Sequence, residues 1–253
     1  MKTIVIALPT YNEAQNIRET ISRIQKVAAE LLKQKSWNLQ VLVIDDNSPD
    51  GTAKIVADII SSGSQPAPGA GQLPELGLIT GQKQGLGAAY IRGITYILQN
   101  MNPDYIMEMD ADLQHSPEDI PRFLEKAEQG YEFIIGSRYI SGKDITEFGF
   151  LRKINSWTAN FIARYLAGIY KVQDCTSGFR CISAKFLRDC NLNTIQSKGY
   201  SFQMSLLKRA YQSKIRITEI PIHFPDRQKG QSKLGLKDIF EFFTDAVKLR
   251  VRK

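Results

Sequence analysis

The first half of the chain alternates short apolar, β-branched runs with longer stretches of helical periodicity. The apolar runs occupy residues 3–8, 39–44, 76–80, 105–109 and 133–135, and helical patterns separate them. Strands that alternate with helices of about ten or more residues are typical of βαβ units, whose parallel strands are joined by right-handed crossovers. The sequence therefore predicts an α/β fold with a mostly parallel sheet flanked by helices.

The second half is less regular but carries two amphipathic helical patterns, at residues 148–170 and 236–251. Strand-like runs lie at 179–183 and 215–222, and a further helix is expected at about 202–211. The uncharged stretch at 61–74 is rich in Gly, Pro and Ser, which predicts a surface loop and not a domain boundary. We therefore expect the 253 residues to form a single domain that ends in amphipathic helices.

Charge is distributed unevenly along the chain. The net charge of +7 comes from 33 Lys and Arg against 26 Asp and Glu. Residues 1–137 hold 11 basic and 17 acidic side chains, a net of −6, whereas residues 138–253 hold 22 and 9, a net of +13. The acidic half could hold a metal, and the basic half could meet phosphates, nucleic acid or an anionic membrane. A solvated basic surface without a partner is the alternative.

Composition excludes several classes of protein. With 43% hydrophobic and 23% charged residues, the chain is not disordered over its whole length. No apolar run approaches the roughly 20 residues that span a bilayer. The three cysteines are odd in number and form no partner motif, so we expect neither a disulfide framework nor a zinc site, as in a cytosolic protein.

The sharpest chemical signal is Asp110-Ala111-Asp112, which directly follows the apolar run at 105–109. Ligands of open α/β sheets gather beyond the carboxyl ends of the strands. Two carboxylates there suit Mg²⁺ or Mn²⁺, which take oxygen ligands, and Gln114 could add a further oxygen. The alternative is a simple turn, because Asp is a common turn residue.

A second pair of carboxylates, Asp45 and Asp46, closes the run at 39–44 and precedes the turn-forming residues 47–51. Adjacent carboxylates repel each other unless a cation or the hydrogen-bond donors of a ligand meet them. A nucleobase or a ribose offers such donors. The alternative is a turn in which Asp50 caps the following helix.

Two further segments flank the same predicted edge of the sheet. Pro9 ends the first run, Tyr11 could stack on a base, and Glu13 could accept a hydrogen bond from a base or ribose, although helix capping alone would explain Glu13. Residues 83–87 begin with Lys83 and contain two glycines. They could approach a phosphate, but they lack the glycine spacing of a dinucleotide-binding fingerprint.

Taken in order, these segments resemble the family 2 glycosyltransferases, which have the GT-A fold, and more closely the dolichol-phosphate (polyprenol-phosphate) mannosyltransferases. The resemblance rests on PTYNE at 9–13, IDDNSPDGT at 44–52, GLG at 85–87, MDADLQH at 109–115, GSRY at 136–139, SGFR at 177–180, SKGYSFQ at 197–203 and FPDRQKGQSKLG at 224–235. It covers almost the whole chain, and the last two segments narrow it to the polyprenol-phosphate branch. It implies a Rossmann-like GT-A sheet, with a nucleotide-sugar and metal half at 1–137 and an acceptor and membrane-facing half at 138–253.

The resemblance also implies roles for individual residues. The nucleotide-sugar donor would be bound by Pro9, Tyr11, Glu13, Ile44, Asp46, Lys83, Asp110, Ala111, Asp112, Arg138, Arg227 and Lys233. Asp112 and Gln114 would ligate Mg²⁺ or Mn²⁺. Asp112 and Arg138 would be the catalytic residues, with Arg138 placed where the donor and acceptor phosphates meet. Arg152 and Ser156 would contact the acceptor phosphate.

The implied reaction transfers mannose from GDP-mannose to dolichyl or polyprenyl phosphate with inversion. A departing nucleoside diphosphate needs a cation and nearby Arg or Lys, and a lipid phosphate that is largely dianionic at neutral pH needs no general base. A lipid acceptor implies a peripheral protein on the cytoplasmic side of a membrane, bound through the helices at 148–170 and 236–251. A small membrane-anchoring subunit is a further candidate partner.

Three alternatives stay open. One is a related family 2 enzyme that uses a UDP-sugar, such as a polyprenyl-phosphate glucosyltransferase. A different class is a basic nucleic-acid-binding protein, but the chain has no recognisable binding motif and its strand ends are acidic, so we expect no nucleic acid partner. A third is a nucleotide-binding subunit without catalysis, which the presence of Asp112, Gln114, Arg138 and Arg227 disfavours. Both amphipathic helices could also simply pack on the sheet.

Overall fold

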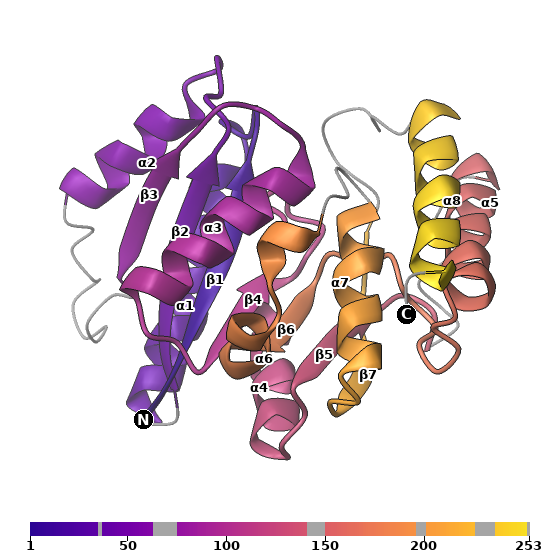
Figure 1. Ribbon diagram of the computed structural model, residues 1–253. Helices are drawn as coiled ribbons and strands as arrows, with labels where there is room; N and C mark the ends of the chain where they lie inside the picture. The colour runs from indigo at the N-terminus through magenta and orange to yellow at the C-terminus, as the bar shows by residue number, and fades with distance from the viewer. Residues whose placement is uncertain (35–36, 63–74, 141–149, 196–200, 226–235, 252–253) are drawn as a thin grey trace.

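A seven-stranded sheet in the order β3-β2-β1-β4-β6-β5-β7 forms the centre of the protein (Figure 1). The computed structural model describes residues 1–34, 37–62, 75–140, 150–195, 201–225 and 236–251. The strands are β1 (Lys2–Thr10), β2 (Trp37–Asp45), β3 (Leu76–Thr80), β4 (Tyr105–Glu108), β5 (Phe133–Ser137), β6 (Arg180–Ser183) and β7 (Ile217–Pro221). Strand β6 runs antiparallel to both of its neighbours, β4 and β5, and every other pair is parallel. The predicted mostly parallel sheet is confirmed.

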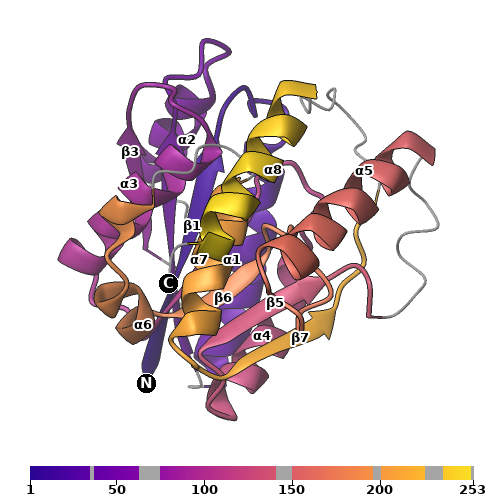
Figure 2. The same ribbon diagram turned by 45° about the vertical axis from the view of Figure 1, so that its right-hand side comes forward.

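Helices cover both faces of the sheet (Figures 1 and 2). They are α1 (Ile17–Lys33), α2 (Thr52–Ser61), α3 (Leu86–Asn100), α4 (Ile120–Glu128), α5 (Phe150–Phe161), α6 (Ala184–Asp189), α7 (Ser201–Gln212) and α8 (Leu236–Val251). Short 3₁₀ turns η1 (Pro117–Asp119) and η3 (Leu192–Thr194) precede α4 and α7, and the π-helical turn η2 (Ile162–Leu166) continues α5.

Strand β1 shows why two helical layers are needed. Its residues from Ile4 to Leu8 are completely buried, as expected of a parallel strand that is covered on both sides. Successive side chains point to opposite faces, so Val5 and Ala7 join a core cluster with α3 and α7, whereas Ile4, Ile6 and Leu8 join one with α1 and α4. The unbroken apolar run at the start of the chain therefore determines its central position.

The second half differs in detail from the sequence prediction. The helix predicted over residues 148–170 is α-helical only to Phe161 and then loosens into η2, while α8 has the predicted bounds. Helix α6 was not predicted, because its six residues are too few to show a helical period. Within the described ranges, no helix combines the length and apolar character needed to cross a bilayer.

Candidate active site

The carboxyl ends of β1, β2 and β4 meet at one edge of the sheet. Pro9 pairs with Ile44 and Thr10 with Asp45 in the β1–β2 register, and the N–H of Asp46 donates to the carbonyl of Thr10 over 3.0 Å. Strand β4 pairs with β1 on its other side and delivers residues 109–115 to the same edge. The three segments that the sequence singled out here therefore lie next to one another.

The repulsion expected between the adjacent carboxylates Asp45 and Asp46 is relieved within the protein. Buried Asp45 accepts hydrogen bonds from the Thr10 hydroxyl (2.9 Å) and from the N–H and hydroxyl of Ser48 (2.8 and 2.6 Å). Asp46, 6% exposed, pairs with Arg92 of α3, whose Nη2 lies 2.6 Å from its Oδ1. Arg92 could not be predicted as a site residue from the sequence, because a helical pattern does not show which strand end a side chain reaches.

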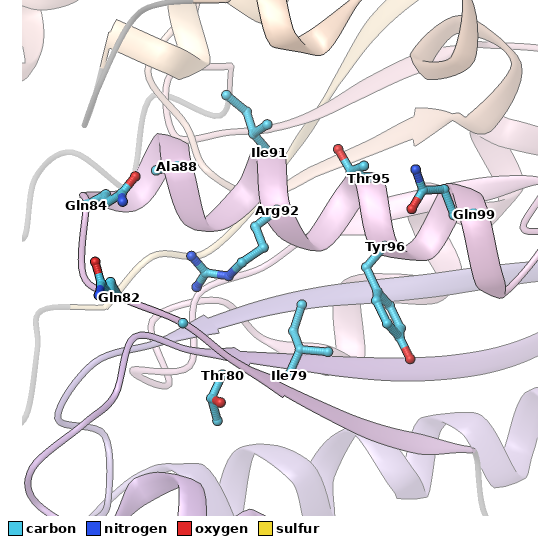
Figure 3. A pocket seen from close by; sticks show the side chains of 11 residues that line it. Ile79, Thr80, Gln82, Gln84, Ala88, Ile91, Arg92, Thr95, Tyr96 and Gln99 are labelled. Carbon is cyan, nitrogen blue, oxygen red and sulfur yellow. The ribbon is translucent and has the colours of Figure 1, made fainter.

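Arg92 extends across a groove between β3 and α3 (Figure 3). The groove has a volume of about 870 Å³, and Gly81, Gln82 and Gln84 line it near Arg92. A Cβ at Gly81 would lie 2.7 Å from Cζ of Arg92, so glycine lets the guanidinium lie against the end of the strand. None of the predicted site residues lines this groove, which borders Asp46 only through Arg92.

The loop after β1 is tied to its neighbours by side chains. The ammonium of Lys83 lies 3.5 Å from the centre of the Tyr11 ring, a cation–π contact that brings these two predicted donor residues together. The N–H of Glu13 donates to the Thr52 hydroxyl at the start of α2, and its carboxylate accepts from Asn16. These contacts place Tyr11, Glu13 and Lys83 near one another at the edge of the sheet where the sequence predicted them.

Asp50 has the capping contact that was predicted as the alternative for its segment. Its carboxylate accepts the N–H of Thr52, the first residue of α2, and the N–H of Ala14, each over 3.0 Å. Burial disfavours the charged carboxylate, but a hydrogen bond from the Thr52 hydroxyl (2.6 Å) and these two N–H groups outweigh it and lower the pKa of Asp50. Asp50 thus connects the loop after β1 to α2.

Residues 110–115 form a closed turn beyond β4. The N–H of Asp110 donates to Nδ1 of His115 (2.9 Å), and Oδ1 of Asp112 accepts the N–H of Gln114 (3.1 Å). His115, 2% exposed, stacks on Phe179 with ring centres 4.7 Å apart. A histidine held in this way acts as a structural support of the turn and not as a solvent-facing base.

The same turn is fixed from outside by two contacts. The hydroxyl of Thr20 in α1 donates to the carbonyl of Ala111 (3.0 Å), and the side-chain amide of Gln114 donates to the carbonyl of Pro225 (2.7 Å). Pro225 directly precedes residues 226–235, where Arg227 and Lys233 lie outside the described residues. The turn therefore contacts Pro225, the last described residue before these two predicted residues.

The residues of this turn fit a hard divalent cation. Asp110, Asp112 and Gln114 offer only carboxylate and amide oxygens, which suit Mg²⁺ or Mn²⁺ better than softer metals. The described ranges contain no cluster of three or more His, Cys, Asp or Glu able to hold a metal by themselves. Mg²⁺ is commonly held by one or two carboxylates together with substrate phosphates. The turn offers these carboxylates, and a bound substrate would supply the remaining ligands.

Arg138 follows β5 and is linked to the Asp110 turn through aromatic rings. Its guanidinium carbon lies 5.4 Å from the centre of the Phe224 ring, which in turn lies 5.4 Å from the ring of His115. Buried Asp174 forms a bidentate ion pair with Arg138. Burial alone would lower the pKa of Arg138, but the Asp174 carboxylate outweighs it and raises that pKa. Sequence analysis missed Asp174, which lies just before the SGFR segment.

The predicted acceptor residues are only partly described. The hydroxyl of Ser156 in α5 lies 2.7 Å from the hydroxyl of Tyr139, the neighbour of Arg138, so Ser156 is close to the predicted phosphate site. Arg152 lies one turn earlier in α5, but its side chain is outside the described part of the structure.

A ladder of exposed aromatic rings runs along α5 and η2. The aromatic ladder consists of Trp157, Phe161, Tyr165 and Tyr170, which are 63%, 47%, 52% and 47% exposed. Neighbouring rings are in contact, with centres 5.6, 4.7 and 6.4 Å apart. Helix α8 packs against η2 and stands beside α5 (Figures 1 and 2). The alternative prediction for this helix was that its apolar residues pack on the sheet, but these four rings remain about half exposed.

A buried polar cluster lies beneath Asp110. Glu108 and Arg180 are register partners on β4 and β6, and both are completely buried. Arg180 donates to three backbone carbonyls, whereas neither carboxyl oxygen of Glu108 has a hydrogen-bond partner among the described residues. Burial raises the pKa of Glu108 to about 7, against the opposing charge of Arg180. The hydroxyl of Tyr90 reaches from this cluster to Asp110 over 3.4 Å.

Known structures share this fold. Glucosyl-3-phosphoglycerate synthase from Mycobacterium tuberculosis, solved with Mn²⁺ and UDP-glucose, superimposes with a TM-score of 0.61 over 96% of this chain and 76% of that one, at 17% identity. Mannosyl-3-phosphoglycerate synthase from Rubrobacter xylanophilus gives a TM-score of 0.60 over 100% and 73%, also at 17% identity. The predicted GT-A type of fold is confirmed.

Sequence comparison defines the family. Residues 5–190 match the model of glycosyl transferase family 2, and the chain belongs to that family. It is 33% identical to the polyprenol monophosphomannose synthase of Mycolicibacterium smegmatis, over 95% of this chain and 83% of that protein. It is 35% identical to the undecaprenyl-phosphate mannosyltransferase of Micrococcus luteus, over 92% and 87%. It is 34% identical to the dolichol-phosphate mannosyltransferase of Pyrococcus furiosus, over 98% of this chain but 64% of that protein.

Proposed function

We propose that this protein transfers mannose from GDP-mannose to a polyprenyl phosphate such as dolichyl phosphate. The observation that carries the proposal is the chain of contacts from Asp110 through His115 and Phe224 to Arg138, which connects an oxygen-rich turn to a half-buried guanidinium. The relatives at 33–35% identity named above act, by their names, on polyprenol-type phosphates. Together these support a site where a nucleotide sugar and a lipid phosphate meet.

On this proposal the first half of the chain binds the donor. Tyr11 and Asp46 receive the nucleoside at the ends of β1 and β2, with Pro9, Glu13, Ile44 and Lys83 around them. Asp112 and Gln114 hold Mg²⁺ or Mn²⁺, with Asp110 and Ala111 beside the diphosphate. When bound there, the cation would supply positive charge for the departing diphosphate. Arg227 and Lys233 add positive charge from residues 226–235.

Arg138 brings the two anions together. Its guanidinium orients the acceptor phosphate toward the anomeric carbon, with Arg152 and Ser156 beside it. A phosphate that is largely dianionic at neutral pH attacks without a general base, which agrees with the buried, stacked position of His115. Attack from the face opposite the diphosphate inverts the anomeric configuration.

The second half of the chain meets the membrane that carries the acceptor. The aromatic ladder, together with exposed Phe243 and Val247 on α8, offers apolar side chains for this contact. Lys248 and Arg250 follow on α8, where they can approach anionic headgroups. We infer peripheral binding of these helices to a cytoplasmic membrane surface, with the acceptor phosphate held near Arg138.

A UDP-sugar donor is the second candidate. The glucosyl-3-phosphoglycerate synthase that shares the fold was solved with UDP-glucose and Mn²⁺, so a UDP-sugar is the donor to compare with GDP-mannose. The base would occupy the same strand ends in either case.

The decisive assay combines the purified protein, polyprenyl phosphate in detergent or vesicles, Mg²⁺ or Mn²⁺, and a sugar-labelled nucleotide. We expect label from GDP-mannose, and not from UDP-glucose, to enter the organic phase. Transfer from UDP-glucose alone would establish the second candidate, and no transfer from either would refute the proposal. Arg138→Ala should lower turnover by orders of magnitude with the fold intact, and near-normal turnover would remove Arg138 from the mechanism.

A further inference from the structure

Asp174 engages one whole edge of the Arg138 guanidinium. Oδ2 of Asp174 accepts the main-chain N–H and the Nε–H of Arg138, over 3.0 and 2.8 Å, and Oδ1 accepts from Nη2 over 2.8 Å. The Thr176 hydroxyl accepts a further hydrogen bond from Nη2, also over 2.8 Å. Of the five N–H donors of a guanidinium, those on Nη1 have no hydrogen-bond partner among the described residues. Arg138 is therefore held by one edge and presents the other.

Asp174 is itself rigidly placed. It is completely buried, and its Oδ1 also accepts the N–H of Ser177 over 3.1 Å. The carboxylate of Glu219 on β7 accepts the N–H groups of Gln173 and Asp174 over 2.8 and 2.9 Å, which fixes this loop to the sheet. The orientation of Arg138 thus depends on a series of contacts that begins in β7.

We propose that Asp174 is a positioning residue that aims Nη1 of Arg138 at the phosphates, an inference that rests on the proposed function. An unheld arginine side chain has many rotamers, and a displacement of about 1 Å at a catalytic group can lower a rate by about 100-fold. The ion pair also neutralises part of the Arg138 charge. Asp174 therefore contributes orientation and not additional attraction for anions.

The first test is Asp174→Asn, which keeps the shape of the side chain but removes its charge. We expect turnover to fall about 10- to 100-fold, by the positional argument above. The KM for donor and lipid phosphate should stay within about threefold, because the cation that attracts the anions is still present. Asp119→Asn is the matched control, since half-buried Asp119 also pairs with an arginine, Arg122, over 2.7 Å, and it should leave turnover unchanged. A raised KM with unchanged turnover would overturn the proposal.

The second test separates positioning from a structural role. Asp174→Asn is combined with Arg138→Ala, and turnover is compared with that of Arg138→Ala alone. If Asp174 acts through Arg138, the added substitution has no further effect on the residual rate. If it lowers that rate by the same factor as in the wild type, Asp174 is structural and the proposal is wrong. A wild-type rate for Arg138→Ala alone would instead refute the role of Arg138 in the proposed function.

Thr176→Val provides a second variant if Asp174→Asn does not fold. It removes the acceptor of the second Nη2 hydrogen bond, together with the longer contacts that the Thr176 hydroxyl donates to Oδ1 of Asp174 (3.2 Å) and accepts from Asn160 (3.4 Å). Thr176 is only partly buried. We expect a turnover reduction of about 3- to 10-fold, about what the loss of one ordinary hydrogen bond produces, because Asp174 still holds the guanidinium. This reduction should disappear in the Arg138→Ala background. Its persistence there would overturn the proposal.

Discussion

The buried carboxyl of Glu108 should make the stability of this protein fall as the pH rises through neutrality. Burial raises the pKa of Glu108 from 4.5 to about 7, so the folded protein retains a proton that the unfolded chain releases. The stabilisation from this proton is fully present below pH 4.5 and is lost as the pH rises through about 7. Ionised Glu108 would be a completely buried charge near the Asp110 carboxylate, and the charge of Arg180 and the side chain of Gln203 offset this only in part.

The size of the effect follows from the two pKa values. They differ by about 2.5 pH units, and each unit corresponds to about 1.4 kcal/mol. The free energy of unfolding should therefore contain a pH-dependent contribution on the order of 3 kcal/mol from this one group. Glu108→Gln keeps the size of the side chain and abolishes the titration.

The assay is urea unfolding of the wild type and of Glu108→Gln at a series of pH values between 4.5 and 8.5. The difference in unfolding free energy between the two proteins should shift by on the order of 3 kcal/mol in favour of the variant as the pH rises. Other titrating groups cancel in this difference. Glu30→Gln, at an exposed carboxylate, is the control and should show no such shift. A difference that does not vary with pH would refute the reasoning.

Three further predictions concern the site and the membrane surface. Asp112→Asn should abolish the stimulation of GDP binding by Mn²⁺, because it removes a carboxylate ligand of the cation. Calorimetry measures this stimulation, and an unchanged value would exclude Asp112 as a ligand. Arg92→Gln should lower the free energy of unfolding by about 1–3 kcal/mol, because it leaves Asp46 buried without its cation; an unchanged urea midpoint would contradict this. Replacing Trp157 and Phe161 by Ser should reduce co-sedimentation with anionic vesicles about tenfold or more at fixed salt, and equal binding would locate the membrane contact elsewhere.

The strand ends show how far the sequence could predict the site. Pro9, Asp46 and Asp110 each follow an apolar run, and parallel strands deliver their carboxyl ends to the same edge of a sheet, so their proximity could be predicted from local pattern. Arg92 and Asp174 escaped prediction because their partners are 46 and 36 residues away in the chain. The location of Arg152, Arg227 and Lys233 relative to this edge stays a prediction.

The adjacent carboxylates Asp45 and Asp46 also show what the sequence could predict and what it could not. Their repulsion was evident from the sequence, and a ligand was the expected remedy, but Thr10, Ser48 and Arg92 already supply the hydrogen bonds and the positive charge. Likewise, the spacing of the aromatic residues on α5 predicted a helix with one apolar face. It could not determine whether that face packs on the sheet, because periodicity records which residues share a side and not what lies opposite.

The sequence by itself determined the α/β alternation, the buried central strands and the polar motifs at their ends, because each of these depends on residues that are close together in the chain. Only the tertiary structure decided that β6 enters the sheet antiparallel between β4 and β5, which brings Asp174 beside Arg138 and Arg180 beside Glu108. Such contacts depend on how distant segments share one buried volume, and no local pattern encodes that arrangement.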